Sequence, residues 1–67
     1  MIIKKVKELK QGEWFTLKPY EYPTDMQVYV RDEYCRSEKK YIAYKYGDVC
    51  YSRLFNGEKE VYTDFIF

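Results

Sequence analysis

Hydrophobic and polar residues alternate near the C-terminus with the two-residue period of a β-strand. Residues 60–67 contain two alternating sets of side chains: Val61, Thr63, Phe65 and Phe67, and Tyr62, Asp64 and Ile66. Successive side chains of a strand point to opposite faces of its sheet, so this segment is predicted to be a strand. Segments dense in β-branched and aromatic residues predict four more strands: residues 13–18, 27–31 with an extension to Tyr34 left open, 41–46 and 49–55.

The segments before and between these strands carry signals for one short helix and one loop. Val6 and Leu9 lie three residues apart and are followed by Gly12, a spacing that predicts a single helical turn ended by glycine. Pro19 and Pro23 lie close together. Since proline cannot donate a hydrogen bond to a sheet ladder, they predict an irregular loop rather than a central strand.

Asn56-Gly57 is the clearest turn signal in the chain, because this pair tolerates the two positive φ angles of a type I′ hairpin. Five short strands, one helical turn and no long helix predict an all-β fold, a single antiparallel meander over residues 1–67. We expect the meander to close into a barrel, since closure hides strand edges. The composition agrees: nine Tyr, four Phe and one Trp are residues that favour half-buried sheet surfaces.

Two stretches resemble known proteins. Residues 9–15, Leu-Lys-Gln-Gly-Glu-Trp-Phe, are similar to the opening of Src-homology-3-like barrels, in which a leucine-containing turn leads through glycine into the first strand. Residues 28–67 resemble small, uncharacterised proteins of bacteriophages and mobile elements. The matching features are Val-Tyr-Val-Arg at 28–31, Tyr34 with Arg36-Ser37, Lys40-Tyr41, Asp48, Asn56-Gly57 and the terminal Val-Tyr-Thr-Asp-Phe-Ile-Phe. The resemblance implies a five-stranded Src-homology-3-like barrel of phage or mobile-element origin, and it implies no activity.

Composition argues against several classes of function. The chain has no His, which removes the commonest general base and metal ligand, and its three glycines are isolated. Asp25 followed by Glu38-Lys39-Lys40 superficially matches a metal-dependent nuclease pattern of an acidic residue and then Glu-x-Lys, but Asp25 falls in a loop and Glu38 in a turn rather than on rigid strands. We therefore expect a non-enzyme with no metal or cofactor.

Charge and cysteine content bear on partners and location. Twelve basic residues against eleven acidic ones give a net charge of +1, too little for duplex DNA binding by bulk charge. No apolar run is long enough for a membrane span, so a cytoplasmic location is expected. Cys35 and Cys50 would then be reduced thiols. Cys50 is predicted to be a small core residue, and whether Cys35 is a functional thiol stays open.

The alternation of Tyr with basic residues predicts a binding face. If Val28, Val30 and Ile42 are core, then Tyr29, Arg31, Tyr41 and Lys45 share the outer face of neighbouring strands. Rings beside cations suit single-stranded nucleic acid, because bases stack on the rings while cations follow the backbone. The candidate nucleic-acid-binding residues are Tyr29, Arg31, Tyr34, Arg36, Lys39, Tyr41 and Lys45. The alternative is that these residues only form cross-strand pairs.

A protein partner is an equally open prediction. Tyr20 and Tyr22 lie between the two prolines and form an aromatic loop able to contact a protein, since Tyr is enriched at interaction hot spots. Such a partner would be a host or defence component, with this chain acting as an accessory or inhibitory factor. A homodimer through Phe65-Ile66-Phe67 is a third arrangement.

Overall fold

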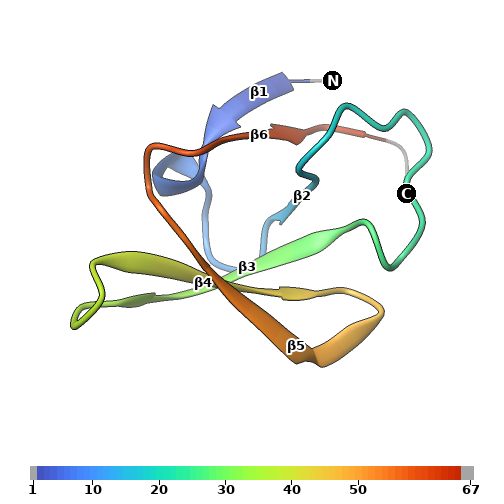
Figure 1. Cartoon of the computed structure of the whole chain (residues 1–67). Coiled ribbons are helices and arrows are strands. Elements are labelled where there is room, and N and C mark those ends of the chain that lie inside the picture. Colours follow the sequence, from blue (N-terminus) through green and yellow to red (C-terminus); the bar gives the residue numbers. More distant parts are fainter. Residues whose placement is uncertain (1, 66–67) are drawn as a thin grey trace.

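Six β-strands and one 3-10 helix are present in the computed structural model, which describes residues 2–65 (Figure 1). The strands are β1 (Ile2–Lys5), β2 (Trp14–Phe15), β3 (Tyr29–Cys35), β4 (Lys40–Lys45), β5 (Asp48–Phe55) and β6 (Glu60–Thr63), and helix η1 (Val6–Glu8) lies between β1 and β2. The predicted all-β class is confirmed, as is a short helical turn near the N-terminus. Of the predicted last strand, residues 66 and 67 lie outside the described part.

The strands form two antiparallel sheets. The large sheet has the order β2-β3-β4-β5, and the small sheet consists of β1 and β6. One bridge joins them: Thr16 N donates to Tyr62 O at 2.9 Å, and Tyr62 N donates to Thr16 O at 3.0 Å. The prediction of one closed five-stranded barrel is therefore not met, because β1 adds a sixth strand and the sheets do not close. The predicted strand 13–18 is short because the chain crosses at Thr16 from the large sheet to the small one.

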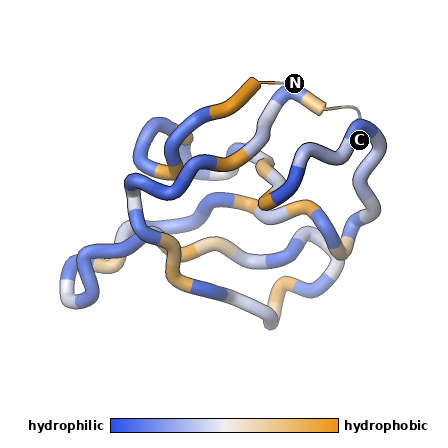
Figure 2. The backbone as a smooth tube through the Cα atoms, turned by 45° about the horizontal axis from the view of Figure 1, so that its top comes forward, coloured by the Kyte–Doolittle hydropathy of each residue, from blue (hydrophilic) through white to orange (hydrophobic). Residues whose placement is uncertain are grey.

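The core lies between the two sheets. Three aromatic rings form its centre: Phe15 packs on Tyr29 with centroids 5.6 Å apart, and Phe55 meets both rings edge-on at 5.6 and 5.5 Å. Around them lie the buried side chains of Val6, Leu9, Ala43 and Val61. Figure 2 shows the resulting pattern, with hydrophobic positions recurring among hydrophilic ones on strands of both sheets. The helical turn thus places Val6 in the core, and Leu9, just after the turn, is buried as well.

The Asn56-Gly57 turn differs from the predicted hairpin. Asn56 and Gly57 are not among the residues with positive φ, so the turn is not type I′. Instead, Asn56 Oδ1 accepts from Glu58 N at 2.9 Å and Asn56 O accepts from Lys59 N at 3.0 Å. The physical reason is topological, because β5 and β6 belong to different sheets and a type I′ turn would pair them.

Two irregularities shape the large sheet. In β3, the register shifts between Arg31 and Tyr34. In β5, Val49, Cys50 and Tyr51 stand between the pairs Lys45↔Asp48 and Tyr44↔Ser52, so they have no counterpart in β4. This bulge lifts Cys50 into solvent, and the prediction of a core cysteine is wrong for that reason.

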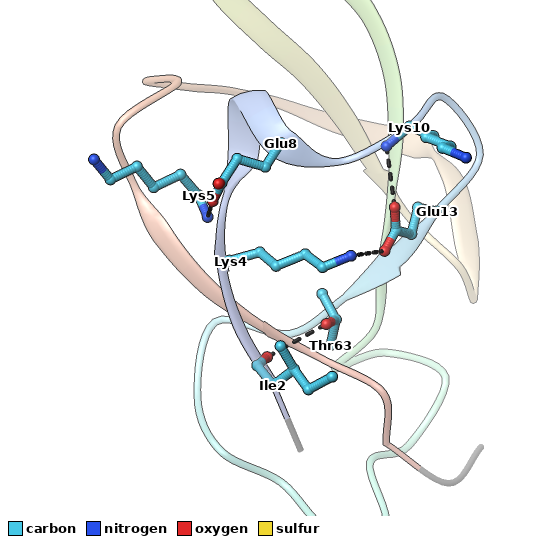
Figure 3. A network of polar contacts seen from close by, with 7 residues as sticks. All are labelled: Ile2, Lys4, Lys5, Glu8, Lys10, Glu13 and Thr63. Carbon is cyan, nitrogen blue, oxygen red and sulfur yellow. Dashed lines mark hydrogen bonds and ion pairs between the residues drawn. The ribbon is translucent and has the colours of Figure 1, made fainter.

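A network of polar contacts fastens β1 and η1 to their neighbours (Figure 3). Glu8 Oε1 accepts from Lys5 N at 2.7 Å, and Glu13 Oε1 accepts from Lys10 N at 3.0 Å. The other oxygen of Glu13 pairs with Lys4 Nζ at 3.4 Å. Since exposed ion pairs contribute at most about 1 kcal/mol each, the network orients β1 more than it stabilises the fold.

Candidate nucleic-acid interface

Side chains of both Tyr and basic residues share one face of the large sheet. Residues directly opposite in an antiparallel ladder point to the same face. Arg31 lies opposite Ala43, which lies opposite Arg53, and Tyr34 lies opposite Tyr41. Lys45 and Tyr51 belong to the same face by alternation within their strands and by contact with each other. We call this set the cation–aromatic face: Arg31, Tyr34, Tyr41, Lys45, Tyr51 and Arg53.

Three cations of this face rest on aromatic rings. The Arg31 guanidinium carbon lies 4.6 Å from the centroid of Tyr41, and Lys45 Nζ lies 4.4 Å from that of Tyr51. The Arg53 guanidinium lies 5.1 Å from the ring centre of Phe55. Such contacts contribute about 0.5–1 kcal/mol each at exposed sites. They hold the cations beside the rings rather than free in solvent.

The rings themselves are grouped. Tyr34 and Tyr41 have centroids 4.8 Å apart. Tyr41 is half-buried against the core, whereas Tyr34 is 44% exposed. Tyr51 is 42% exposed. The face therefore offers two accessible rings, Tyr34 beside Tyr41 and, toward the other end of β4, Tyr51 beside Lys45.

The positive charge of this face is not neutralised by neighbouring carboxylates. Within residues 2–65 the ion pairs are Lys4–Glu13, Lys5–Glu58 and Lys7–Glu58, and all of them join residues outside the cation–aromatic face. The hydrogen bonds that Lys7 and Lys5 donate to Glu58 lower the pKa of that carboxyl to about 2. The ion pairs of the described residues thus lie at β1, η1 and the segments next to them, and none involves a cation of the cation–aromatic face.

Arg31 is the best-fixed cation of the face. Its N–H donates to Glu13 O at 3.0 Å, and its carbonyl accepts from Gly12 N at 2.7 Å. The Nε atom is buried and has no hydrogen-bond partner in the described chain. The backbone hydrogen bonds fix the strand at this position, and the ring of Tyr41, rather than an ion pair, contacts the side chain.

The structure brings most of the predicted nucleic-acid residues together. Arg31, Tyr41 and Lys45 share a face with Tyr34, and the exposed Arg36 and Lys39 lie in the turn that joins β3 to β4. Lys39 has a φ of 55°, a left-handed conformation that closes this turn.

Tyr29 does not belong to an accessible surface. It is 5% exposed and lies in the aromatic core, so its assignment to an outer face is wrong. The face that it shares with Arg31 is the side of the large sheet that carries the core, where Ala43 and Phe55 are buried as well, so only its margins are accessible. Ile42 is correspondingly not part of the main core, where Ala43 lies instead.

Tyr51 and Arg53 were missed by sequence reasoning. Alternation within residues 49–55 would have placed both on the face of Phe55, and Arg53 next to an aromatic ring. The signal was present, but it needed the register of β5 against β4, which the bulge at Val49–Tyr51 breaks.

The opposite side of the large sheet is mainly apolar. Trp14, Val30 and Tyr44 lie in one row across three strands, and Ile42 lies opposite Leu54 in the next. Tyr46 meets Trp14 edge-on with centroids 5.5 Å apart. We call this set the outer face: Trp14, Val30, Ile42, Tyr44, Tyr46 and Leu54.

The two tyrosines predicted for protein binding are not equivalent. Tyr22 is 69% exposed in the irregular segment between β2 and β3. Tyr20 is half-buried and lines a shallow pocket with a volume of about 180 Å³. The other lining residues are Leu17, Lys18, Met26, Gln27 and Tyr29.

Cys35 is half-buried at the end of β3. Its Sγ lies 3.4 Å from Ser37 Oγ. The hydrogen bond from Ser37 lowers the pKa of the thiol, with the Glu38 backbone N–H acting in the same direction.

Comparisons with protein-family models, curated proteins and solved structures found no match. Among residues 2–65, no helix has the length and apolar character needed to cross a membrane.

Proposed function

We propose that this protein is a non-catalytic binding module that holds single-stranded nucleic acid on the cation–aromatic face. One observation carries the proposal: Arg31, Lys45 and Arg53 each lie against an aromatic ring on one sheet face, without a carboxylate partner within residues 2–65. Single strands are favoured over duplexes because only unpaired bases can offer their ring faces to tyrosine.

The chemistry of the face suits this ligand. Stacking of a base on an aromatic side chain contributes about 1–3 kcal/mol, and Tyr34 and Tyr51 present the accessible rings. Lys45 lies over the ring of Tyr51 and Arg31 over that of Tyr41, and both could neutralise the phosphates that connect the stacked bases. Arg36 and Lys39 would extend the path along the β3–β4 turn.

Fold kinship and origin are part of the same proposal. We propose a Src-homology-3-like barrel that is open between its two sheets, with support from the β3-β4-β5 meander, the long segment 17–28 before it and the Thr16–Tyr62 bridge. A phage or mobile element as source, and the cytoplasm as location, rest on the sequence pattern alone.

A protein partner is the second candidate. The 69% exposure of Tyr22 favours it, because a large ring projecting from a loop provides a contact point for a host or defence protein. The cation–aromatic face would then serve only to stabilise the sheet.

The test is fluorescence anisotropy of a labelled single strand of about 15 nucleotides, a length within the range of one small β-barrel, and of its duplex. The protein is titrated at low and moderate salt. We expect salt-dependent binding that is stronger for the single strand. Arg53→Ala should weaken it and make the slope of log K against log salt shallower by about 0.7, the value for one phosphate contact on a single strand.

Lys59→Ala is the matched control, because it removes the same charge from an exposed position outside the face. It should leave affinity and slope unchanged. Equal effects of the two substitutions would show that binding depends on net charge alone, and would contradict the proposed face. Absence of binding at low salt would contradict nucleic-acid binding altogether and favour the protein partner.

A further inference from the structure

Asn56-Gly57 lies in the connection between β5 and β6, which passes from the large sheet to the small one (Figure 1). Asn56 is the single asparagine of the chain, and it is exposed to solvent. The carboxamide of an asparagine can react with the backbone nitrogen of the next residue, because the two groups belong to one short stretch of chain and close a five-membered ring. A following glycine obstructs this attack least, since it has no Cβ.

The nitrogen that would attack is not engaged by the fold. Within residues 2–65, Gly57 N donates no hydrogen bond. By contrast, Gly12 N donates to Arg31 O at 2.7 Å. The amide nitrogen of Asn56 also has no hydrogen-bond partner in this part of the chain. Neither the attacking nor the leaving nitrogen therefore has to give up a contact within the described protein before it reacts.

The carbonyl group of the Asn56 side chain is held and polarised. Glu58 N donates to Asn56 Oδ1 at 2.9 Å. This bond folds the carboxamide forward along the chain, toward the peptide unit that contains Gly57 N. It also directs an N–H at the oxygen on which negative charge develops when a nucleophile adds to the carbonyl carbon. A donor placed in this way stabilises the tetrahedral intermediate.

We propose that Asn56 is a site of spontaneous deamidation in the folded protein, with Gly57 N as the nucleophile and the N–H of Glu58 as the oxyanion donor. The Gly57 nitrogen forms a bond to Asn56 Cγ and loses its proton to solvent. The Cγ–Nδ2 bond breaks, and the amide leaves as ammonia with a proton taken from solvent. Water then opens the cyclic imide. Attack at Cγ gives aspartate, and attack at the main-chain carbonyl carbon gives isoaspartate.

The two products differ in their effect on the connection. Aspartate at position 56 keeps an oxygen that can accept from Glu58 N, and its one negative charge takes the net charge of the chain from +1 to 0. Isoaspartate routes the backbone through the side chain and inserts a methylene before Gly57. Little room exists there, since a Cβ on Gly57 would lie 3.0 Å from Tyr41 Cε2 and 3.2 Å from Lys7 Cβ. Isoaspartate should therefore disturb the contacts of Gly57 with β4 and η1, whereas aspartate should not.

Incubation of the folded protein at physiological temperature and mildly basic pH tests the proposal. Mass spectrometry of the tryptic peptide of residues 54–59 follows the reaction, because replacing NH2 by OH adds about 1 Da. Aspartate and isoaspartate have the same mass and are separated by reversed-phase chromatography. The reference is a synthetic peptide of residues 52–60, which lacks the fold. We expect the folded chain to react no more than about tenfold slower than this peptide, because its nucleophile is free and its carbonyl is oriented.

Two substitutions at Glu58 isolate the role of its N–H. Glu58→Pro removes the N–H, and Glu58→Gln is the matched control, since it removes the same carboxylate but keeps the N–H. Glu58→Pro should react at least about tenfold more slowly than Glu58→Gln, a smaller effect than the loss of an oxyanion donor from a water-excluded active site. Asn56→Gln should show no gain in mass, because its carboxamide would have to close a larger ring.

The products are compared by urea unfolding. Asn56→Asp should keep the urea midpoint of the wild type, whereas the isoaspartate form, isolated by chromatography, should unfold at a lower urea concentration. Equal midpoints would show that Gly57 tolerates the longer backbone and would contradict the predicted difference between the products.

A folded chain that reacts more than about tenfold slower than the peptide would overturn the proposal, because the fold would then protect Asn56. Equal rates for Glu58→Pro and Glu58→Gln would overturn the role given to the N–H. All these measurements are made on the protein without nucleic acid, so their outcome is independent of the proposed function.

Discussion

Gly12 occupies a position where the backbone alone dictates the residue type. Its φ is +91°, and an added Cβ would meet no atom within 4 Å. Its N–H donates to Arg31 O at 2.7 Å, so the turn before β2 cannot relax without losing a contact to β3. Gly12→Ala therefore introduces backbone strain without a steric clash.

The expected loss of stability follows from two opposing effects. An L-residue held in a left-handed conformation costs about 1–2 kcal/mol, whereas alanine restricts the unfolded chain and so recovers about 0.4–1 kcal/mol. The net loss is about 1 kcal/mol. For a domain of this size, that corresponds to a fall in Tm of about 4–8 °C.

Urea unfolding followed by the emission of Trp14 measures this loss. A chain of 67 residues is also short enough for chemical synthesis, which allows D-Ala at position 12. A D-residue adopts positive φ without strain, so we expect a gain of about 0.4–1 kcal/mol over glycine. If L-Ala is neutral or stabilising, or if D-Ala is no better than L-Ala, a positive φ at Gly12 is refuted.

Two further predictions concern the core and the ion pairs. Phe55→Ala should destabilise the fold by about 3–5 kcal/mol, because Phe55 touches the rings of both Phe15 and Tyr29; thermal unfolding that is unchanged would contradict this core. The folded-state pKa of Glu58 is lowered from its usual 4.5 to about 2, so the stability that it contributes is complete above pH 4.5 and is lost as the pH falls toward 2. Glu58→Gln should remove that part of the pH dependence from the urea midpoint, and identical pH profiles for variant and wild type would show that the contacts with Lys7 and Lys5 do not persist in solution.

Strand positions in the middle of the chain could be predicted from sequence, but the side on which the core lies could not. Predicted strands 41–46 and 49–55 match β4 (Lys40–Lys45) and β5 (Asp48–Phe55) to within one residue at each end. Both faces of the large sheet carry apolar side chains, however. Val28 and Val30 are buried on one side, and Tyr29 and Ala43 on the other. The main core forms on the side on which the small sheet packs. Its strand β1 has only four residues, too few to be predicted from the sequence pattern.

The candidate site shows the same division. Alternation correctly grouped Arg31, Tyr41 and Lys45 on one face, because a two-residue period needs no knowledge of neighbouring strands. The burial of Tyr29 and the contribution of Arg53 depend on what lies across and beside that face. Both features depend on tertiary structure. The connection at Asn56-Gly57 depends on it too, since the same dipeptide can join paired strands or direct the chain to a different sheet.

The pairing of β1 with β6 has a consequence for synthesis. Ile2 lies opposite Thr63, so β1 is synthesised long before the strand with which it pairs. Until then Ile2 and Ile3 remain without a sheet, and Val6 lacks the Lys59 carbonyl that accepts its N–H at 2.9 Å. Contacts this distant in sequence also slow folding, because the chain must close its largest loop to make them. A chain that stops before residue 60 would release an unpaired hydrophobic strand, and such a fragment is a substrate for chaperones and proteases rather than a smaller version of the domain.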